Sequence, residues 1–414
     1  MHRYDLISCH DCGVLHQRLP VRPREKARCV RCRSVLYRGI HSDASRMAAI
    51  TLGALIVFVI AQCCPIVELE VGGTASRATL LGAILVLWQE QMPLVAAAVF
   101  LFTLMLPALE LLSLLHVTLA LALGHRPHGF NLLLRAAHMA RRWGMTEVLM
   151  IGILITIVKM TSLATVVLQP GLFAFGALTL MLAVVVSFDP KLLWNLGDHL
   201  PPQAAAQAVP ALHDVLSCHV CGLVSADQHH AHQDCPRCHA RLHHRRPDSL
   251  GRTWAYLIAA AILYIPANLL PVMYTHSLFG QEDDTIISGV LYFWNSGSPA
   301  LAAIIFIASI TVPVLKLAAL SLLTWTSQRR SRWRPLQRTV LYRLVEFVGR
   351  WSMLDIFVIT LTVALVRFQS LAVITAGPGA LAFCAVVVLT MLASMQFDPR
   401  LIWDPLPLHG ERHA

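Results

Sequence analysis

Eight of the 11 cysteines stand in four Cys-x-x-Cys pairs, a residue type and spacing that can hold metal ions. The pairs are Cys9 and Cys12, Cys29 and Cys32, Cys218 and Cys221, and Cys235 and Cys238. Two such pairs can place four thiolates tetrahedrally around one ion, as in structural zinc sites. The sequence therefore predicts two small four-cysteine zinc-ribbon domains, each before an apolar stretch, and two structural Zn²⁺ as cofactors.

Two alternatives to zinc remain open from the residues alone. Four thiolates also suit iron in a rubredoxin-like site, and the cysteines could instead be reduced thiols without metal. Five histidines lie near the pairs and could suggest mixed ligation: His10, His16, His219, His232 and His239. Because four thiols are already present at each site, we expect these histidines to be solvated surface residues.

A second chemical signal is a set of ionisable residues inside apolar segments. The set is Glu110, Glu147, Lys159, Lys316, Asp355 and Arg367. A charge at the bilayer centre costs about 2.5–3.5 kcal/mol even on a lenient scale, so such groups normally face protein or a wet cavity. We interpret the set as candidates for a lipid path or an intramembrane polar network. The alternative is that they are helix-packing pairs or snorkelling ends.

Lys316 and Asp355 are expected to pair. At a rise of about 1.5 Å per residue, both fall about 25–32 Å from the outer surface, because Lys316 follows Pro299 and Asp355 precedes Ala376 by similar lengths of helix. Removing one partner of a buried ion pair typically costs about 3–5 kcal/mol, whereas removing both is milder. The sequence therefore predicts opposite charges at one depth on neighbouring spans.

The equivalent positions of the first half carry two acids, Glu110 and Glu147. Two carboxylates at one level would repel, so we expect one to be protonated or bound to a nearby base such as His116 or Arg141. No acid stands in the turns next to Lys159 or Arg367, which the pattern places deeper in their spans. The two halves thus differ in electrostatics, and only one of them is expected to carry the working site.

The spans that position these residues occur twice. From Trp143 to Gly171 and from Trp351 to Gly379 the sequence repeats at an offset of 208 residues, with nine of 29 positions identical. The acid, the base and the Pro-Gly pair recur in both copies, and a Phe-Asp-Pro-basic-x-x-Trp motif follows each. We infer a tandem duplication.

The apolar segments predict eight spans, four in each half. A spanning helix needs about 20 apolar residues, and 56% of the chain is hydrophobic against 14% charged. The expected first spans are 47–64 and 253–270, the second spans 93–123 and 299–325, and the third spans end at Leu168 and Ala376; Pro170 and Pro378 open the fourth spans. Basic connectors, 124–142 and 327–350, separate the second and third spans, and short apolar pieces at 80–88 and 286–294 are expected to be interfacial or re-entrant.

Basic residues predict the orientation. Of the 33 Lys and Arg, only Arg77 falls in a segment expected outside, and the acidic run Glu282–Asp284 also falls there. The positive-inside rule therefore places both termini and both four-cysteine domains in the cytosol, where disulfides are disfavoured. The net charge of +10 then follows from topology and attraction to anionic lipid, and no nucleic-acid partner is expected.

The predicted fold class is an all-α polytopic membrane protein built from two four-helix modules, each preceded by a zinc ribbon. The expected domains are 1–46 (first ribbon), 47–200 (first module), 201–252 (linker and second ribbon) and 253–414 (second module and tail). No cleavable signal peptide is expected, since the first 46 residues contain no apolar core.

The repeated motifs resemble the PqiA/YebS (LetA) family, the paraquat-inducible protein A proteins of Gram-negative inner membranes. The resemblance covers nearly the whole chain and implies a periplasmic MCE-domain protein as partner, phospholipid as cargo, and a role in intermembrane lipid transport and envelope integrity. One departure is Cys63-Cys64 at the end of the first span, where the second half has Leu269-Leu270.

Three classes of function remain open. The first is a lipid transport subunit without enzymatic activity; no Walker A sequence is present, so ATP hydrolysis by that route is not expected. The second is a membrane redox protein that passes electrons from the four-cysteine metal centres to Cys63-Cys64 or to quinone. The third is a membrane scaffold or sensor whose four-cysteine domains bind a cytosolic protein.

Overall fold

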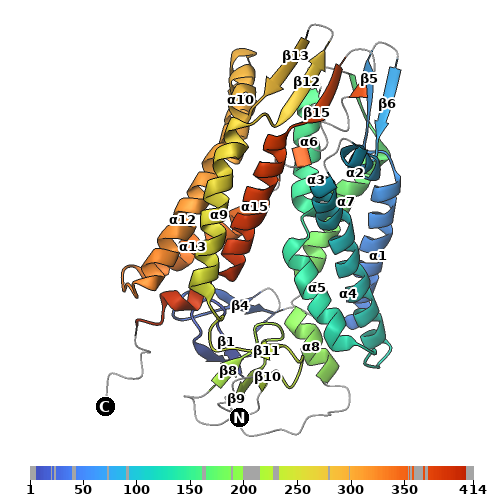
Figure 1. Cartoon of the computed structure of the whole chain (residues 1–414). Helices are drawn as coiled ribbons and strands as arrows, with labels where there is room; N and C mark the ends of the chain where they lie inside the picture. Colours follow the sequence, from blue (N-terminus) through green and yellow to red (C-terminus); the bar gives the residue numbers. More distant parts are fainter. Residues whose placement is uncertain are drawn as a thin grey trace.

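Helices of two halves stand side by side in the computed structural model, with small β-sheets at one end and two four-cysteine units at the other (Figure 1). The structure describes residues 6–19, 21–22, 25–39, 43–71, 74–89, 93–160, 165–187, 190–198, 215–226, 233–277, 280–297, 299–352, 354, 357–358, 367–368 and 372–406.

The first four-cysteine unit (residues 6–39) and the second four-cysteine unit (residues 215–242) are each made of two short β-hairpins. The strands of the first unit are β1 (Leu6–Ser8), β2 (Leu15–Gln17), β3 (Lys26–Arg28) and β4 (Val35–Arg38). Those of the second unit are β8 (Val215–Ser217), β9 (Val224–Ala226), β10 (Gln233–Asp234) and β11 (Arg241–Leu242). Every hairpin carries one Cys-x-x-Cys pair in its turn.

The two halves repeat one order of elements, which is consistent with the predicted duplication. The first half contains α1 (Ala44–Cys63), β5 (Val67–Val71), β6 (Thr74–Ala78), α2 (Leu80–Gln89), α3 (Pro93–Phe100), η2 (Leu101–Met105), α4 (Leu106–Ala122), α5 (Phe130–Trp143), α6 (Thr146–Met160), β7 (Thr165–Leu168), α7 (Pro170–Ser187) and α8 (Pro190–Asp198). The second half contains α9 (Ser249–Leu269), β12 (Met273–Ser277), β13 (Gly280–Asp284), α10 (Ile286–Asn295), α11 (Pro299–Phe306), η3 (Ile307–Thr311), α12 (Val312–Gln328), α13 (Pro335–Trp351), β14 (Arg367–Phe368), β15 (Ala372–Ala376), α15 (Pro378–Gln396) and η4 (Pro399–Ile402).

Five helices of the described residues are long and apolar enough to cross a membrane. They are 44–63, 93–122, 249–269, 302–328 and 378–396. They match the predicted first and second spans of both halves and the fourth span of the second half. The helices α2 and α7 are apolar but shorter, and most of the third span predicted for the second half lies outside the described residues.

A π-helical turn interrupts the second span of each half at the same place. The N–H of Leu106 bonds to the carbonyl of Leu101, and the N–H of Val312 bonds to that of Ile307, both five residues apart. The next residue in each case is a proline, Pro107 or Pro313. Because proline has no N–H, it cannot extend the α-helical ladder, and the widened turn accommodates it.

The repeated Pro-Gly pair holds the last span against the end of the first. The N–H of Gly171 bonds to the carbonyl of Pro65, and the N–H of Gly379 bonds to that of Pro271, both at 2.9 Å. A Cβ on Gly171 would lie 2.4 Å from the oxygen of Pro65, and one on Gly379 would lie 2.5 Å from the oxygen of Leu270. Only glycine permits so close an approach of two backbones.

The prediction of an all-α chain is wrong at the end of the molecule away from the four-cysteine units. There β5 pairs antiparallel with β6 and β7, while β12 pairs with β13 and β15, and β14 pairs with β15 (Figure 1). The predicted third spans therefore do not extend as helices to Leu168 and Ala376. Helix α6 ends at Met160, and the residues up to Leu168 and Ala376 form the strands β7 and β15. Their Val- and Thr-rich residues suit a sheet that pairs with the hairpin after the first span.

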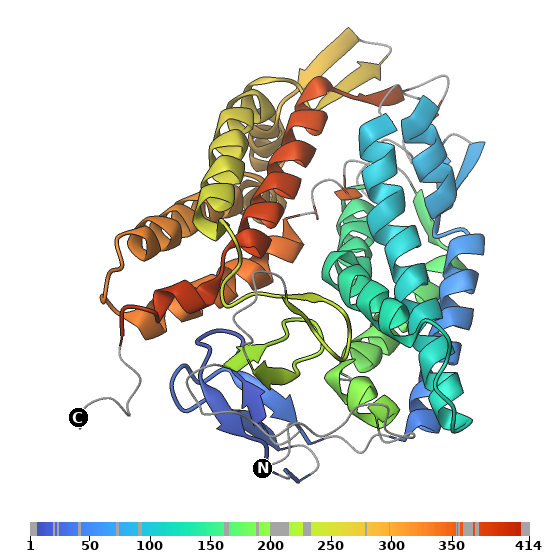
Figure 2. The ribbon, with the colours of Figure 1, turned by 60° about the horizontal axis from the view of Figure 1, so that its bottom comes forward.

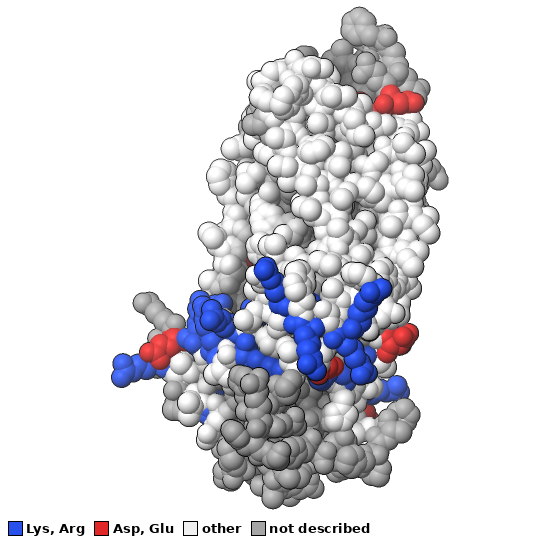
Figure 3. Space-filling model, turned by 90° about the vertical axis from the view of Figure 1, so that its left-hand side faces the viewer, with Lys and Arg blue, Asp and Glu red and all other residues white. Residues whose placement is uncertain are grey.

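The basic connectors are helices rather than loops. They form α5 and α13, whose buried residues include Leu134, Ala137 and Ala140 in the first half. These residues recur at a spacing of three, so one face of α5 packs against the other helices. Arg141, one turn beyond Ala137 on that face, is only 19% exposed. From one side the molecule shows a largely uncharged body above a band of Lys and Arg (Figure 3).

The halves meet where α6 of the first half contacts Leu354 and Phe357 of the second. A Cβ on Gly152 of α6 would lie 3.2 Å from the Cβ of Phe357 and 3.8 Å from Leu354 Cδ1. Leu354 and Phe357 are both buried and belong to the same cluster as the core of the first half. The small residue on α6 therefore lets the third segment of the second half pack closely on the first.

Candidate functional site

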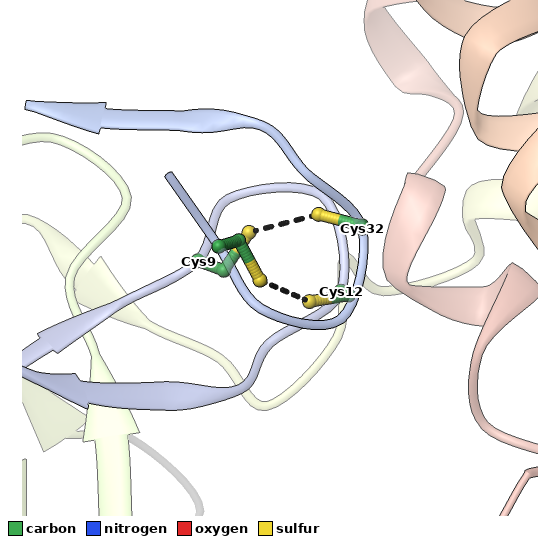
Figure 4. Close-up of side chains that lie close together, drawn as sticks. Cys9, Cys12 and Cys32 are labelled. Carbon is green, nitrogen blue, oxygen red and sulfur yellow. Dashed lines mark hydrogen bonds between the residues drawn. The ribbon is translucent and has the colours of Figure 1, made fainter. Parts of the chain in front are cut away.

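The four cysteines of the first four-cysteine unit face one another in its interior. The Sγ atoms of Cys9 and Cys32 are 3.4 Å apart, and those of Cys12 and Cys29 are 3.5 Å apart. Figure 4 shows the thiols of Cys9, Cys12 and Cys32 turned inward from the hairpin turns. All four are buried, and none is in a disulfide.

The second four-cysteine unit repeats this geometry. The Sγ atoms of Cys218 and Cys238 are 3.5 Å apart, and those of Cys221 and Cys235 are 3.6 Å apart. In each unit the four sulfurs all lie within 4.8 Å of one another. A tetrahedral zinc with Zn–S bonds of about 2.3 Å requires sulfurs about 3.8 Å apart, so both sets of thiols fit such an ion.

The turn of each hairpin is a knuckle that directs two sulfurs to one point. The carbonyl of the first cysteine accepts a hydrogen bond from the N–H of the fifth residue of the turn, which has a positive φ in all four cases. These fifth residues are Gly13, Arg33, Gly222 and His239. The backbone thus positions the thiols, and a metal bound there would hold two hairpins together as a structural element.

Two further side chains touch the sulfurs of the first unit. His16 Nε2 lies 3.2 Å from Cys29 Sγ, and Ser34 Oγ lies 3.0 Å from Cys9 Sγ. The expectation that all neighbouring histidines are surface residues therefore fails for His16, which lies beside a candidate ligand. A hydrogen bond from such a group to a thiolate orients the ligand. His232 lies outside the described residues.

The first four-cysteine unit docks on the second half, although the chain leads from it directly into the first half. Its cysteines form one buried cluster with Leu323, Tyr342, Phe397, Ile402 and Trp403. Figure 2 shows this unit beneath the end of α15 and the short η4.

Polar contacts fix this position. Arg31 stacks over Trp403 at 4.9 Å from the ring centroid and donates to the carbonyl of Leu406 at 2.9 Å. Arg343 of α13 pairs with Asp11 at 2.6 Å and donates to the carbonyl of Cys32 at 3.0 Å. Both the stacked arginine and the paired aspartate stand between the cysteines of a pair.

The second four-cysteine unit docks on the first half through the equivalent residues. Arg237 stacks over Trp194 of α8 at 5.8 Å from the ring centroid and donates to Asn195 Oδ1 at 2.8 Å. The cysteines of this unit join the buried cluster that contains Trp194 and Leu193. Each unit therefore presents the arginine of Cys-x-Arg-Cys to the tryptophan that ends the opposite copy of the Phe-Asp-Pro motif.

Asp398 organises the Phe-Asp-Pro motif of the second half. Its carboxylate accepts hydrogen bonds from Arg400 at 2.9 and 2.8 Å and from the backbone N–H of Arg246 at 3.2 Å. Burial opposes its ionisation, but the hydrogen bonds and charge of Arg400 and the backbone N–H groups lower the pKa of this carboxyl below its usual value. Ser249 at the start of α9 donates to Gln396 O, which joins the first and last spans.

Of the two bases expected near Glu110, His116 and Arg141, the structure places Arg141 beside it. Glu110 of α4 is buried, and its Oε1 lies 4.0 Å from Arg141 Nε at the end of α5. Arg141 also donates to the carbonyl of Val186 in α7. Glu147, in the first turn of α6, has an exposed side chain, so the two acids of the first half differ in their surroundings.

Lys316 occupies the position of Glu110 in the second half, but it lacks the equivalent of Arg141. The residue that follows Arg141 by the repeat offset is Gly349, and Lys316 Nζ lies 3.4 Å from where a Cβ of Gly349 would stand. Lys316 is buried, and among the described residues no group accepts a hydrogen bond from its Nζ. The predicted partner, Asp355, lies outside the described residues.

The other two basic residues predicted inside spans, Lys159 and Arg367, lie in different kinds of element. Lys159 lies in the last turn of α6. The expectation that Arg367 lies inside a spanning helix is wrong, because Arg367 is in β14, opposite Val373 of β15. The apolar residues around it were read as one continuous helix, whereas the chain at this position is a strand of the sheet.

The sequence profile described as Paraquat-inducible protein A matches residues 44–197 and 250–406, which are the two halves without the four-cysteine units. The chain belongs to the paraquat-inducible protein A family. Together with its five apolar helices, this membership makes it a multi-pass membrane protein.

Relatives of the family align over nearly the full length. The chain is 34% identical over 406 residues to the intermembrane transport protein PqiA of Escherichia coli K12, in an alignment that covers 97% of this chain and 96% of the relative. It is 31% identical to the lipophilic envelope-spanning tunnel protein A of the same strain, over 97% and 92% of the two chains. It is 30% identical to a probable intermembrane transport protein of Haemophilus influenzae, over 97% and 96%. No solved structure matches the chain.

Proposed function

We propose that this chain is the inner-membrane subunit of an intermembrane lipid transport system. It passes phospholipid to or from a periplasmic MCE-type partner, supports envelope integrity, and has no enzymatic activity of its own. The observation that carries the proposal is the full-length relationship to proteins named for intermembrane transport. Because the alignments include both the spans and the four-cysteine units, the whole chain corresponds to those relatives.

The topology proposed for this function has eight spans, with both termini and both four-cysteine units in the cytosol. Exposed arginines lie between α12 and α13, at the end near the four-cysteine units: Arg329, Arg330, Arg332 and Arg334. Arg329 stacks over Trp325 at 4.5 Å, an aromatic–basic pairing typical of a membrane interface. The sheets at the other end would then face the periplasm, where a partner can reach them.

Lys316 supports the lipid part of the proposal. A buried ammonium without an acceptor among the described residues is costly unless an anion or water occupies the site. A phospholipid headgroup supplies such an anion through its phosphate. We therefore assign Lys316, together with Asp355, to the lipid path of the second half, and Glu110 with Arg141 to helix packing in the first.

Co-purification tests this function most directly. The chain is extracted from native membranes, and bound lipids and proteins are identified by mass spectrometry. We expect stoichiometric phospholipid and an MCE-domain protein. The double variant Lys316→Leu with Asp355→Leu should be as abundant as the parent but carry less phospholipid, because the anion-binding group is lost and no buried charge is left unpaired. Purified chain with neither lipid nor an MCE-domain partner would refute the proposal.

The pairing of Lys316 with Asp355 has its own test. Asp355→Asn should lower the level of protein, because an unpaired buried charge remains. Leu at both positions should restore the level. If the pair lines a lipid path, envelope function stays lost in this double variant, and we expect that result. Full function at normal abundance would instead show that the pair only packs helices.

The redox alternative receives less support from the fold. Cys63 and Cys64 end α1, whose start lies toward the four-cysteine units, so a helix of 20 residues separates the two ends. Such a helix is about 30 Å long. Elemental analysis separates the alternatives: two zinc per chain supports transport with structural sites, and two iron would favour electron transfer.

A further inference from the structure

The docking of the two four-cysteine units is exchanged between the halves. The first unit precedes the first half in the chain, yet its arginine contacts Trp403 of the second half. The second unit precedes the second half, yet its arginine contacts Trp194 of the first. Strand β1 of one unit also lies beside β9 of the other. The ends of both halves near these units are therefore joined through the two units.

The contacting groups are built into the cysteine turns. Asp11 stands between Cys9 and Cys12, and Arg31 stands between Cys29 and Cys32. Arg343 bonds both to Asp11 and to the carbonyl of Cys32, which belong to two different hairpins. Arg343 of the second half therefore bridges the two hairpins, and it can do so only while they keep their relative position. A metal ion bound by the four thiolates would fix that position.

The two tryptophans that the arginines contact, Trp403 and Trp194, are packed against other helices of their own halves. Trp403 is buried, and its Nε1 donates to Thr339 Oγ1 of α13 at 3.0 Å. The short helix η4 that precedes it follows the last span directly and is capped by Asp398. Trp194 is buried and meets Phe130 of α5 edge-on at 5.4 Å. In both halves the docked tryptophan therefore connects the last span with the helix that follows the second span.

We propose that the four-cysteine units are exchanged clamps: metal occupancy of each unit secures the end of the opposite half. Loss of metal from the first unit separates its two hairpins, which withdraws Asp11 and Arg31 and frees η4 and the end of α15. Loss from the second unit withdraws Arg237 and frees α8. The metal content of one unit thereby regulates the last span of the other half, and this inference does not depend on the identity of the transported substance.

Hydrogen exchange with mass spectrometry tests the exchange of partners in the full chain. The variants Cys29→Ser with Cys32→Ser, and Cys235→Ser with Cys238→Ser, each remove one site. The first should raise exchange about tenfold at residues 397–406 and leave 190–198 unchanged, and the second should do the reverse. A rise within the half that follows the altered unit, or equal rises in both regions, would overturn the proposal.

The arginines provide variants that keep both metal sites. Arg31→Ala should raise exchange at 397–406, and Arg237→Ala should raise it at 190–198, while each protein retains two metal ions per chain. Arg28 and Arg241 are exposed in the same units and do not contact the tryptophans in the described part of the chain, so Arg28→Ala and Arg241→Ala are matched controls. If the arginine variants exchange like their controls, the contacts do not clamp the halves and the proposal fails.

Discussion

The first and second halves place opposite charges at equivalent points of one backbone. In the first half Glu110 meets Arg141, which comes from the end of the next helix. In the second half a cation, Lys316, replaces the acid, and Gly349 replaces the arginine. The first half therefore sets a cation 4.0 Å from its buried acid, although Glu110 Oε1 accepts no hydrogen bond among the described residues, while the second leaves a buried ammonium facing a residue without a side chain. Duplication preserved the helices and specialised their interior.

Substitution of the glycine in the Pro-Gly turn that both halves share is expected to cause the largest loss of stability. Gly171→Ala and Gly379→Ala each force a methyl group onto a carbonyl oxygen less than 3 Å away, of Pro65 and Leu270 respectively. We expect each to lose about 3 kcal/mol of stability, because backbone atoms cannot move aside easily. Thermal unfolding of the purified protein measures the loss. Gly289→Ala is the control, since nothing lies within 4 Å of its Cβ position.

A similar loss in both variants would confirm that the Pro-Gly turn is an element common to the halves. If only one variant were destabilised, the two turns would not be equivalent, and the halves would share their helices but not this turn.

Substitutions at Glu110 and at Lys316 should change the stability of the chain by different amounts. Glu110→Gln should destabilise the chain by about 2 kcal/mol, below the usual range of about 3–5 kcal/mol for a broken buried pair, because the pair is 4.0 Å apart and Arg141 keeps its bond to Val186. Lys316→Leu combined with Asp355→Leu should not destabilise it, since no buried charge is then left without its partner. Chemical unfolding measures both. Equal destabilisation by the two changes would contradict the assignment of a closed first half and an open second half.

The sequence was sufficient for the features that depend on local spacing. The Cys-x-x-Cys pairs identified both sets of thiols, and apolar length identified the first and second spans. It failed where an apolar segment was ambiguous: the run that ends at Ala376 contains Val and Ile, and only pairing with β12 shows that it is a strand. For Glu110 the sequence offered His116 or Arg141 as a base, because a buried acid requires one, and the fold decides for Arg141.

Exchange of the four-cysteine units could not be read from the residues. Which tryptophan an arginine contacts depends on long-range docking, and Trp194 and Trp403 end equivalent motifs. A signal was nevertheless present: Arg31 and Arg237 recur at one position of the second cysteine pair in each unit, and a repeated charged residue between metal ligands suggests a repeated contact.

The third prediction uses pH to examine the Phe-Asp-Pro motif. The folded pKa of Asp398 lies below its ordinary value of 3.8. Its contribution to stability is therefore fully present above that value and is lost as the pH falls through the folded pKa. Asp398→Asn should cost about 1–2 kcal/mol at pH 7 and progressively less below pH 3.8.

Unfolding monitored by tryptophan fluorescence at several pH values gives this difference. Asp404→Asn is the control, because its pair with Arg245 is 40% exposed and surface pairs contribute less than about 1 kcal/mol. A cost of Asp398→Asn that does not change between pH 7 and acid would show that its charge is not what holds the motif. The same change at Asp189 asks whether the first half uses its motif in the same way.

The smallest effect on stability is expected from rebuilding the first half's ion pair in the second. Gly349→Arg alone brings a second cation to Lys316, and Lys316→Glu alone buries an acid without a base, so each single variant should lose protein. Together they recreate the arrangement of Glu110 and Arg141, and the shorter glutamate leaves room for the new arginine. The double variant should therefore return close to the parental level, which fluorescence-detected size exclusion measures across all four proteins. Its transport should stay absent, because the ammonium that would bind the headgroup is gone and the new arginine is neutralised within the protein. A double variant no more abundant than either single would show that the helices α12 and α13 do not meet as α4 and α5 do, and that the halves differ in packing as well as in charge.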